Sequence, residues 1–204
     1  MFTTPRLVAI ALCAALNFAI GIIVYLVKLP IYLDSVGTIL CALLLFPDRR
    51  AALVCAFLAG FLGVLLSAFI NPFLPWFTPT VLGIALVSAL LTARATPTFR
   101  ASPVGAAFVA SVVGYGILTG LVAAVVSAPI VVYLFGGVTG SGSAFLVAFF
   151  LKTGQQLMTS ALLTGITAEP IDKTLQVLLA ALLYRATPQE FIDLLRRSDR
   201  PATA

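Results

Sequence analysis

Long runs of apolar residues follow one another along almost the whole chain, separated by short polar or charged turns. The first run extends from Leu7 to Val27 and lies between Arg6 and Lys28. About 20 consecutive apolar residues in a helix are enough to cross the hydrocarbon core of a bilayer. Of the 204 residues only 9% are charged, whereas a soluble domain carries about 25% charged residues. The chain is therefore predicted to be an all-α integral membrane protein.

Six transmembrane helices are expected from the positions of the runs. Pro30, Thr78-Pro79 and Ser102-Pro103 mark helix starts, because proline has no amide hydrogen to lose in a first turn. We expect Pro129 to bend or end the fifth helix. The expected helices cover residues 7–27, 30–46, 51–70, 78–93, 103–128 and 174–184, with a charged or polar turn at 47–50, 94–100 and 168–173.

The segment 144–166 differs from the other apolar runs, because Lys152, Gln155 and Gln156 lie near its middle. If it crossed the bilayer, the protein would have seven helices, and the arginine-rich tail would lie outside. Cytoplasmic loops carry an excess of lysine and arginine, which argues against seven crossings. The segment is therefore predicted to be re-entrant, or to lie along the outer surface as a helical segment before the last helix.

Basic residues give the expected orientation. With both termini cytoplasmic, all nine arginines fall on the inner side, and only Lys28 lies in an outer loop. Residues 1–187 are expected to form one polytopic domain in the plasma membrane. The capping-box pattern at 187–190 predicts that residues 188–204 form a short cytoplasmic tail with an amphipathic helix.

Polar residues that this topology places in the outer half form the predicted substrate-binding site. An ionisable side chain in a membrane span costs about 2.5–3.5 kcal/mol to insert, so each is a functional candidate. A pocket of this kind, with aromatic walls, suits a small organic molecule with a flat ring and hydrogen-bonding atoms. The candidates are Tyr32, Asp34, Asn71, Trp76, Gln155, Gln156, Asp172 and Lys173.

Structural explanations remain open for several of these residues. Asp34 lies one turn inside the expected second helix, where a carboxylate is favoured by the helix dipole without any ligand. Asp172 and Lys173 can form an ion pair that fixes a loop to a helix. Trp76 suits the aromatic belt at a membrane surface.

Several classes of function are excluded by what the sequence lacks. There is no histidine, which removes the commonest metal ligand and general base, so no metal and no cofactor is expected. Cys13, Cys41 and Cys55 are widely spaced in apolar runs and are expected to be small buried residues. The basic residues form no stripe, so the chain is not expected to bind nucleic acid. An enzyme is not expected either. The enzyme alternative that remains is aspartyl-type catalysis, in which the carboxylates of Asp34 and Asp172 would pair.

The first helix carries small residues at every fourth position: Ala11, Ala15 and Ala19. Their methyl groups form a smooth strip along one helix face, which lets another helix approach closely in lipid. The strip is expected to pack either inside the protein or against a partner.

These features together resemble the substrate-binding S components of energy-coupling factor (ECF) transporters. The resemblance rests on the alanine strip, on Leu29-Pro30-Ile31-Tyr32-Leu33-Asp34-Ser35-Val36-Gly37-Thr38, on Asn71-Pro72 and on Pro170-Ile171-Asp172-Lys173. It implies a six-helix subunit of an ABC importer that captures a vitamin or cofactor precursor from the outside. It also implies that Ala11, Ala15 and Ala19 dock a transmembrane coupling subunit, which works with ATPase subunits, and that outer loops close over the ligand.

Two questions are left open by the sequence. Riboflavin-like, thiamine-like and pyridoxine-like ligands all fit the predicted polar residues. The alternative function is a self-sufficient small membrane transporter or a membrane sensor module.

Overall fold

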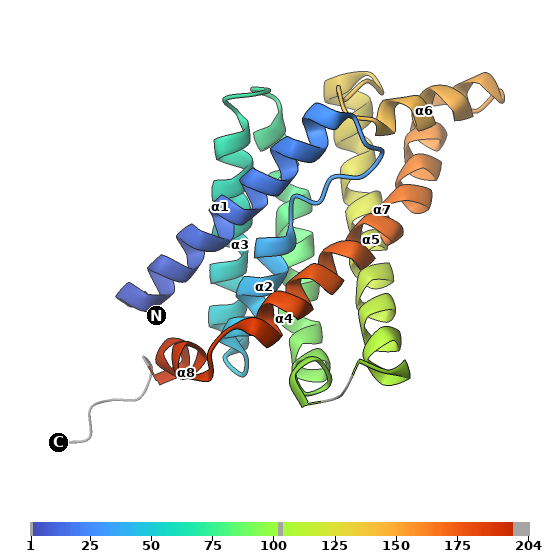
Figure 1. The fold of residues 1–204 in the computed structure, drawn as a ribbon. Helices are drawn as coiled ribbons and strands as arrows, with labels where there is room; N and C mark the ends of the chain where they lie inside the picture. Colours follow the sequence, from blue (N-terminus) through green and yellow to red (C-terminus); the bar gives the residue numbers. More distant parts are fainter. Residues whose placement is uncertain (1, 102–103, 198–204) are drawn as a thin grey trace.

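The computed structural model describes residues 2–101 and 104–197, which form a helical bundle without any strand (Figure 1). In chain order the helices are α1 (Thr4–Val27), α2 (Val36–Leu45), α3 (Arg49–Ser67), α4 (Thr78–Ala101), α5 (Ala106–Phe135), α6 (Ser143–Lys152), α7 (Leu157–Ala186) and α8 (Gln189–Arg197). A 3-10 turn, η1 (Leu74–Phe77), precedes α4.

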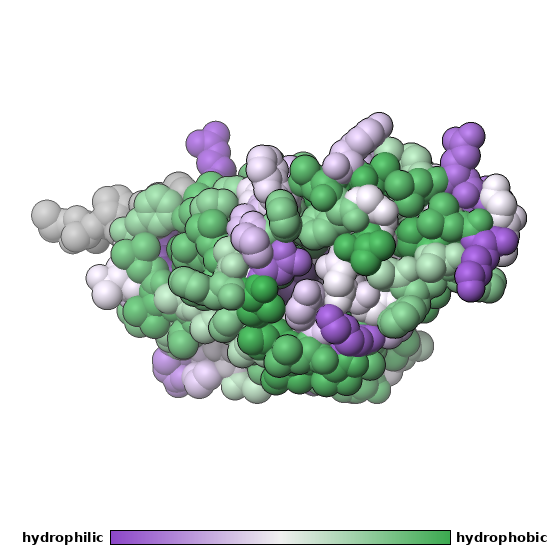
Figure 2. Space-filling model, turned by 90° about the horizontal axis from the view of Figure 1, so that it is seen from above, coloured by the Kyte–Doolittle hydropathy of each residue, from purple (hydrophilic) through white to green (hydrophobic). Residues whose placement is uncertain are grey.

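The protein is membrane-embedded, and most of the surface seen in Figure 2 is hydrophobic. Within the described residues, four helical stretches are long and apolar enough to cross a bilayer: Thr4–Val27, Arg49–Ser67, Leu74–Arg100 and Ala106–Phe135. Large apolar side chains such as Leu12, Leu90 and Val125 are more than half exposed on these helices, as expected where lipid and not water surrounds the bundle. Six crossings remain a prediction, because α2 has only ten residues, and α7 carries charged residues in its middle.

Helix α2 forms the centre of the bundle. Nine of its ten residues are buried, and it packs against α1, α3, α4 and α7. Ten residues of helix are about 15 Å long, which is half the hydrocarbon thickness. The chain therefore reaches α2 through an irregular segment, residues 28–35, that enters the bundle from the end where α1 finishes (Figure 1).

The expected start of the second helix at Pro30 is wrong, and with it the placement of Asp34 inside a helix. The helix begins at Val36, and Leu33 adopts a positive φ of 50°. Side chains of α7 bind the backbone amides of Tyr32 and Leu33, so these amides are satisfied without helix formation. Buried backbone donors need such partners.

The expected break at residues 168–173 is also wrong, because α7 is a continuous helix that passes through Pro170. Residues 157–166, expected to precede the last helix, belong to α7, and only α6 lies across the end of the bundle (Figure 1). Gly120 explains the continuity: a Cβ placed there would lie 2.6 Å from the backbone of Pro170. The glycine lets α5 support α7 where the proline removes a hydrogen bond.

Two other helices also extend further along the chain than expected. Helix α5 continues through Pro129 to Phe135, and α4 continues through the expected turn at 94–100, including Pro97. Prolines are tolerated in membrane helices whose neighbours and hydroxyl side chains satisfy the freed backbone groups. The expected start at Ser102-Pro103 lies outside the described residues.

Arginines join the helix ends at the end of the bundle where the chain begins. Arg185 donates to the Phe99 carbonyl at 3.2 Å, and Arg100 donates to the Tyr184 carbonyl at 3.0 Å. Arg6 donates to the Leu195 carbonyl of α8 at 3.0 Å. Cations at helix C-termini satisfy carbonyls that have no partner within the helix. We call this the arginine end; its cytoplasmic location remains a prediction.

Helix α8 is the amphipathic helix that the pattern of the tail predicts. Its Ile192 and Leu195 are fully buried and join the same hydrophobic core as α2 and α7. Cys13, Cys41 and Cys55 are buried in this core, as expected for small apolar residues.

Candidate functional site

A cavity lies in the half of the bundle away from the arginine end. It measures about 90 Å³ and is bounded by α1, α3, η1, α4, α5 and α7, together with the loop 28–35 and the loop between α5 and α6. At roughly 10–15 Å³ per water molecule, the space holds roughly six to nine waters. A ligand of one or two small rings fits such a volume.

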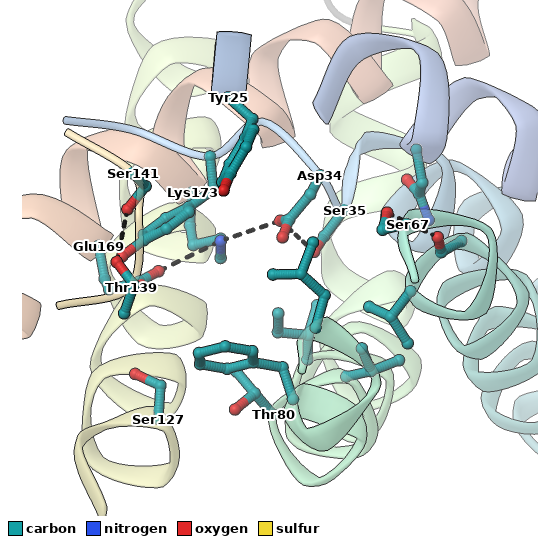
Figure 3. Close-up of a pocket in the computed structure, with 18 residues that line it drawn as sticks. Tyr25, Asp34, Ser35, Ser67, Thr80, Ser127, Thr139, Ser141, Glu169 and Lys173 are labelled. Atoms are coloured by element: carbon teal, nitrogen blue, oxygen red, sulfur yellow. Dashed lines mark hydrogen bonds and ion pairs between the residues drawn. The ribbon is translucent and has the colours of Figure 1, made fainter. Parts of the chain in front are cut away.

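One wall of the cavity carries charge (Figure 3). The ammonium of Lys173 lies 2.6 Å from the Asp172 carboxylate, 3.2 Å from Glu169 and 3.7 Å from Asp34. Lys173, Glu169 and Asp34 line the cavity, whereas Asp172 lies behind them and is fully buried. Three carboxylates therefore share one ammonium.

Asp172 fixes the loop that precedes α2. Its Oδ1 accepts hydrogen bonds from the backbone amides of Tyr32 and Leu33, both at 3.0 Å. Its Oδ2 accepts from Lys173 and from Gln176 Nε2 at 2.7 Å, and Gln176 in turn accepts from the Ser35 amide at 2.9 Å. Helix α7 thus holds Asp34, which lies between these bound amides, at the cavity.

Hydroxyl groups extend the polar wall toward the end of the bundle that is opposite the arginine end. The Tyr32 hydroxyl donates to Ser143 Oγ at 2.6 Å. Ser143 belongs to a group with Thr139 and Ser141, in which Ser141 Oγ lies 2.8 Å from each of the other two hydroxyls. Burial raises the pKa of the Tyr32 phenol above its usual range, so this side chain is a neutral donor and acceptor.

The two loops on the cavity's outer side pack against each other. Lys28 Nζ donates to the Gly140 carbonyl at 2.5 Å and lies 4.4 Å from the centre of the Tyr25 ring. A Cβ at Gly142 would overlap the carbonyl of Lys28. Only glycine allows this approach, so the loops 28–35 and 136–142 form a joint cover over the site.

Asn17 of α1 holds the inner end of the loop. Its Oδ1 accepts from the amides of Gly37 and Thr38 at 2.6 and 3.4 Å, and its Nδ2 donates to Thr38 Oγ1 at 2.9 Å. These amides belong to the first turn of α2, where backbone amides have no carbonyl acceptor within the helix. Asn17 therefore acts as a cap supplied by another helix.

The opposite wall is apolar and contains one buried hydroxyl without a partner. Val64, Phe77, Val81 and Ile84 line this side. Thr80 Oγ1 is buried and makes no hydrogen bond, and Figure 3 places Thr80 across the cavity from Lys173. A hydroxyl buried without a partner costs free energy that a ligand's polar group can recover.

The structure brings together half of the residues predicted for the site. Tyr32, Asp34 and Lys173 line the cavity, and Asp172 contacts them from behind. The other four candidates, which are Asn71, Trp76, Gln155 and Gln156, are absent from the cavity wall.

These four residues have local surroundings of their own. Asn71 Oδ1 accepts from the Phe73 amide within its own loop. Trp76 is 59% exposed, and Gln155 and Gln156 are exposed in the turn between α6 and α7. Their predicted role in binding therefore gains no support from the geometry.

Three important residues were not among the predicted site residues: Glu169, Asn17 and Thr80. Glu169 could have been found, because it lies four residues before Lys173 and opposite charges at this spacing meet on a helix face. Asn17 and Thr80 gave no such signal, since single polar residues are common in apolar helices.

The alanine strip lies on the outside of the bundle. Ala11, Ala15 and Ala19 are all exposed, while the opposite face of α1 packs on α2 and α3 through residues such as Ile10 and Cys13. The first of the two expected alternatives, packing of the strip inside the protein, is therefore wrong.

No protein-family model, no curated protein and no solved structure matches this chain. Among the described residues, no group of histidine, cysteine, aspartate and glutamate is arranged to hold a metal ion. The function is therefore argued from the geometry of the site.

Proposed function

We propose that this chain is the substrate-capture subunit of an ECF-type ABC importer. It binds a vitamin or a related cofactor precursor from the outside and delivers it together with a transmembrane coupling subunit and ATPase subunits. The observation that carries the proposal is the cavity itself: a polar, partly charged space within an apolar bundle, away from the arginine end. Charged groups inside a membrane protein are expensive and are kept where function requires them.

The composition of the walls supports binding of a small organic molecule. Apolar side chains on α3 and α4 face hydroxyl and charged groups on α7 and the loops, which is the usual balance of a small-molecule site. Water-soluble precursors of cofactors combine a flat ring with polar substituents, and each part finds a matching wall.

The covering loops support capture and release. The cover is closed by a few polar contacts, chiefly Lys28 with Gly140 and Tyr32 with Ser143. Hydrogen bonds of this kind contribute about 0.5–1.5 kcal/mol each, so they can open and close at modest cost. Closure of such loops shields a bound ligand from water.

The exposed alanine strip supports docking of a partner in the membrane. Ala11, Ala15 and Ala19 leave a flat path along α1, and small residues let helices approach closely in lipid, where van der Waals packing drives association. The delivery step therefore uses α1 as the contact with the coupling subunit.

Two experiments test the proposal. The first is co-purification of the chain with an ECF coupling subunit, in which Ala15→Trp is expected to abolish the association. Leu90→Trp is the matched control, because Leu90 is an exposed residue on α4. Equal association of the two variants would contradict the docking role.

The second experiment separates an importer subunit from a self-sufficient transporter or a sensor. The chain is reconstituted into vesicles and supplied with the compound that it retains during purification, as identified by mass spectrometry. Uptake is expected only when the coupling and ATPase subunits are present and ATP is supplied. Uptake by the chain alone would contradict the proposal.

A further inference from the structure

We propose that the ligand of this cavity is an organic cation, a small flat ring compound that carries a positively charged nitrogen. The inference rests on the proposed function, since it specifies the chemistry of the molecule that the cavity binds. Four observations carry it: the balance of charge, an unsatisfied carboxylate oxygen, the absence of a second cation on the cavity wall, and the apolar wall opposite.

The balance of charge at the site is negative. Lys173 Nζ has the carboxylates of Asp172, Glu169 and Asp34 within 2.6–3.7 Å. The shortest of these contacts is with Asp172, which lies outside the cavity wall and is already bound by two backbone amides. Lys173 and Asp172 therefore neutralise each other as a buried pair. Glu169 and Asp34, which face the cavity, are left with a shared ammonium and no cation of their own.

Glu169 has an unused acceptor at the cavity. The residue is 6% exposed, and its Oε2 is buried without a hydrogen bond, although the Lys173 ammonium lies 3.2 Å away. A buried carboxylate is costly when its only nearby cation is shared with other carboxylates. In Figure 3 Glu169 and Asp34 lie on opposite sides of the Lys173 ammonium, beside the open space of the cavity. A cationic N–H group placed in that space supplies a second donor and a second positive charge.

No other basic residue lines the cavity in the part of the chain that the structure describes. Lys28 is in the covering loop, where its ammonium binds the Gly140 carbonyl and the Tyr25 ring. The remaining polar side chains of the wall are hydroxyls and the amide of Asn17, and Tyr32 stays neutral because burial raises the pKa of its phenol. On the described part of the wall, Lys173 is therefore the one cation for both Glu169 and Asp34, and it is also paired with Asp172.

The apolar wall favours an organic cation with a flat ring over a bare metal ion. Val64, Val81 and Ile84 offer no group to solvate a bare ion, and no set of metal ligands occurs among the described residues. Phe77 and Tyr25 add aromatic rings to the lining, and such rings attract a cation as well as a flat ligand ring. The charged nitrogen therefore lies at the α7 side, with the ring against α3 and α4.

The test uses three probes that share one ring and differ in charge. Benzamidine is a planar cation at neutral pH, benzamide is its neutral counterpart, and benzoate is the anion. Each is titrated into the purified full-length chain in detergent at pH 7, after removal of any retained compound, and binding is measured by isothermal calorimetry. Benzamidine is expected to bind at least about tenfold more tightly than benzamide, because its hydrogen bonds to carboxylates are charge-assisted. Benzoate is expected to bind least.

Variants assign the preference to the two carboxylates. Glu169→Gln and Asp34→Asn are each expected to reduce the preference for benzamidine by about tenfold. Glu190→Gln is the matched control, because Glu190 is exposed on α8 near the arginine end, and it is expected to keep the full preference. Asp34 has a half-exposed side chain, so Asp34→Asn remains informative if Glu169→Gln does not fold.

The outcomes separate the two proposals. Equal or tighter binding of benzamide or benzoate would overturn the cationic ligand while leaving a small-molecule site in place. The same conclusion follows if benzamidine binds best but both carboxylate variants keep the preference. Failure of all three probes, together with the absence of any retained small molecule in the native preparation, would overturn both proposals.

Discussion

Charged side chains are buried or partly buried at both ends of this bundle, but they are satisfied in different ways. At the arginine end, Arg6, Arg100 and Arg185 donate to carbonyls at the ends of α8, α7 and α4. At the cavity, three carboxylates share the one ammonium of Lys173, and an oxygen of Glu169 has no hydrogen bond. The first arrangement is completed by groups of the protein itself, whereas the second has room for a ligand to complete it, as proposed above.

This difference separates residues that hold the fold from residues that we propose bind the ligand. Among the charged residues at the cavity, Lys173 belongs to both groups. With Asp172 it anchors the loop before α2, and with Glu169 and Asp34 it lines the cavity. Variants of the two kinds of residue should therefore differ in stability, from a large loss for Lys173 to a small change for Glu169.

Lys173→Met is expected to be the most destabilising change. It leaves Asp172 fully buried without its nearest counterion, and breaking a buried ion pair costs about 3–5 kcal/mol. Thermal unfolding in detergent measures the effect. Lys152→Met is the control, because Lys152 is exposed at the end of α6, and it should unfold like the native protein. An unchanged unfolding temperature for Lys173→Met would show that the pair is not needed for the fold.

Gly120→Ala tests the contact that keeps α7 continuous. The added Cβ would lie 2.6 Å from the Pro170 backbone, so α5 and α7 must separate, at a cost of about 1–3 kcal/mol for overpacking. Gly114→Ala on the same helix meets nothing within 4 Å and should be neutral or stabilising. The same unfolding assay compares the two variants, and equal stabilities would refute the close packing of α5 on α7.

Arg100→Met tests the arginine end. The variant loses hydrogen bonds to the Tyr184 and Thr187 carbonyls, and we expect a loss of about 1–2 kcal/mol in stability. Retention of a small molecule by the folded protein should be unaffected. Loss of the retained compound in a folded Arg100→Met protein would contradict the separation of the two ends.

Glu169→Gln is expected to have the smallest effect on stability and a large effect on binding. The side chain keeps its shape and an acceptor for Lys173, and removal of one of three carboxylates relieves repulsion, so the change in stability should be within about 1 kcal/mol. Unfolding temperature and ligand retention are measured on the same preparation. A strongly destabilised variant would place Glu169 with Asp172 among the residues that hold the fold.

The sequence was sufficient to predict the class of protein and part of the site. Apolar runs identified α1 and α3, because the composition of a membrane helix is a local property. The predicted topology also brought Tyr32, Asp34 and Lys173 to one side, since residues at the same depth in a bundle can meet.

Other features depend on contacts between distant segments. In the sequence, the charges and the proline at 169–173 predict a turn, because charge and proline usually end an apolar helix. In the structure Lys173 forms ion pairs with both Glu169 and Asp172, and Gly120 lets α5 pack closely against the proline. The segment 28–35 could not be predicted either, because its conformation depends on hydrogen bonds from α7.

The most direct test of the cavity as a ligand site is native mass spectrometry of the chain released from detergent. We expect the native protein to carry one small organic molecule, and Val64→Trp to lose it, because Val64 lines the cavity. Leu62→Trp, at an exposed position two residues earlier on α3, should keep the molecule. A native protein without any bound molecule, or equal retention by Val64→Trp and Leu62→Trp, would contradict a binding site in this cavity.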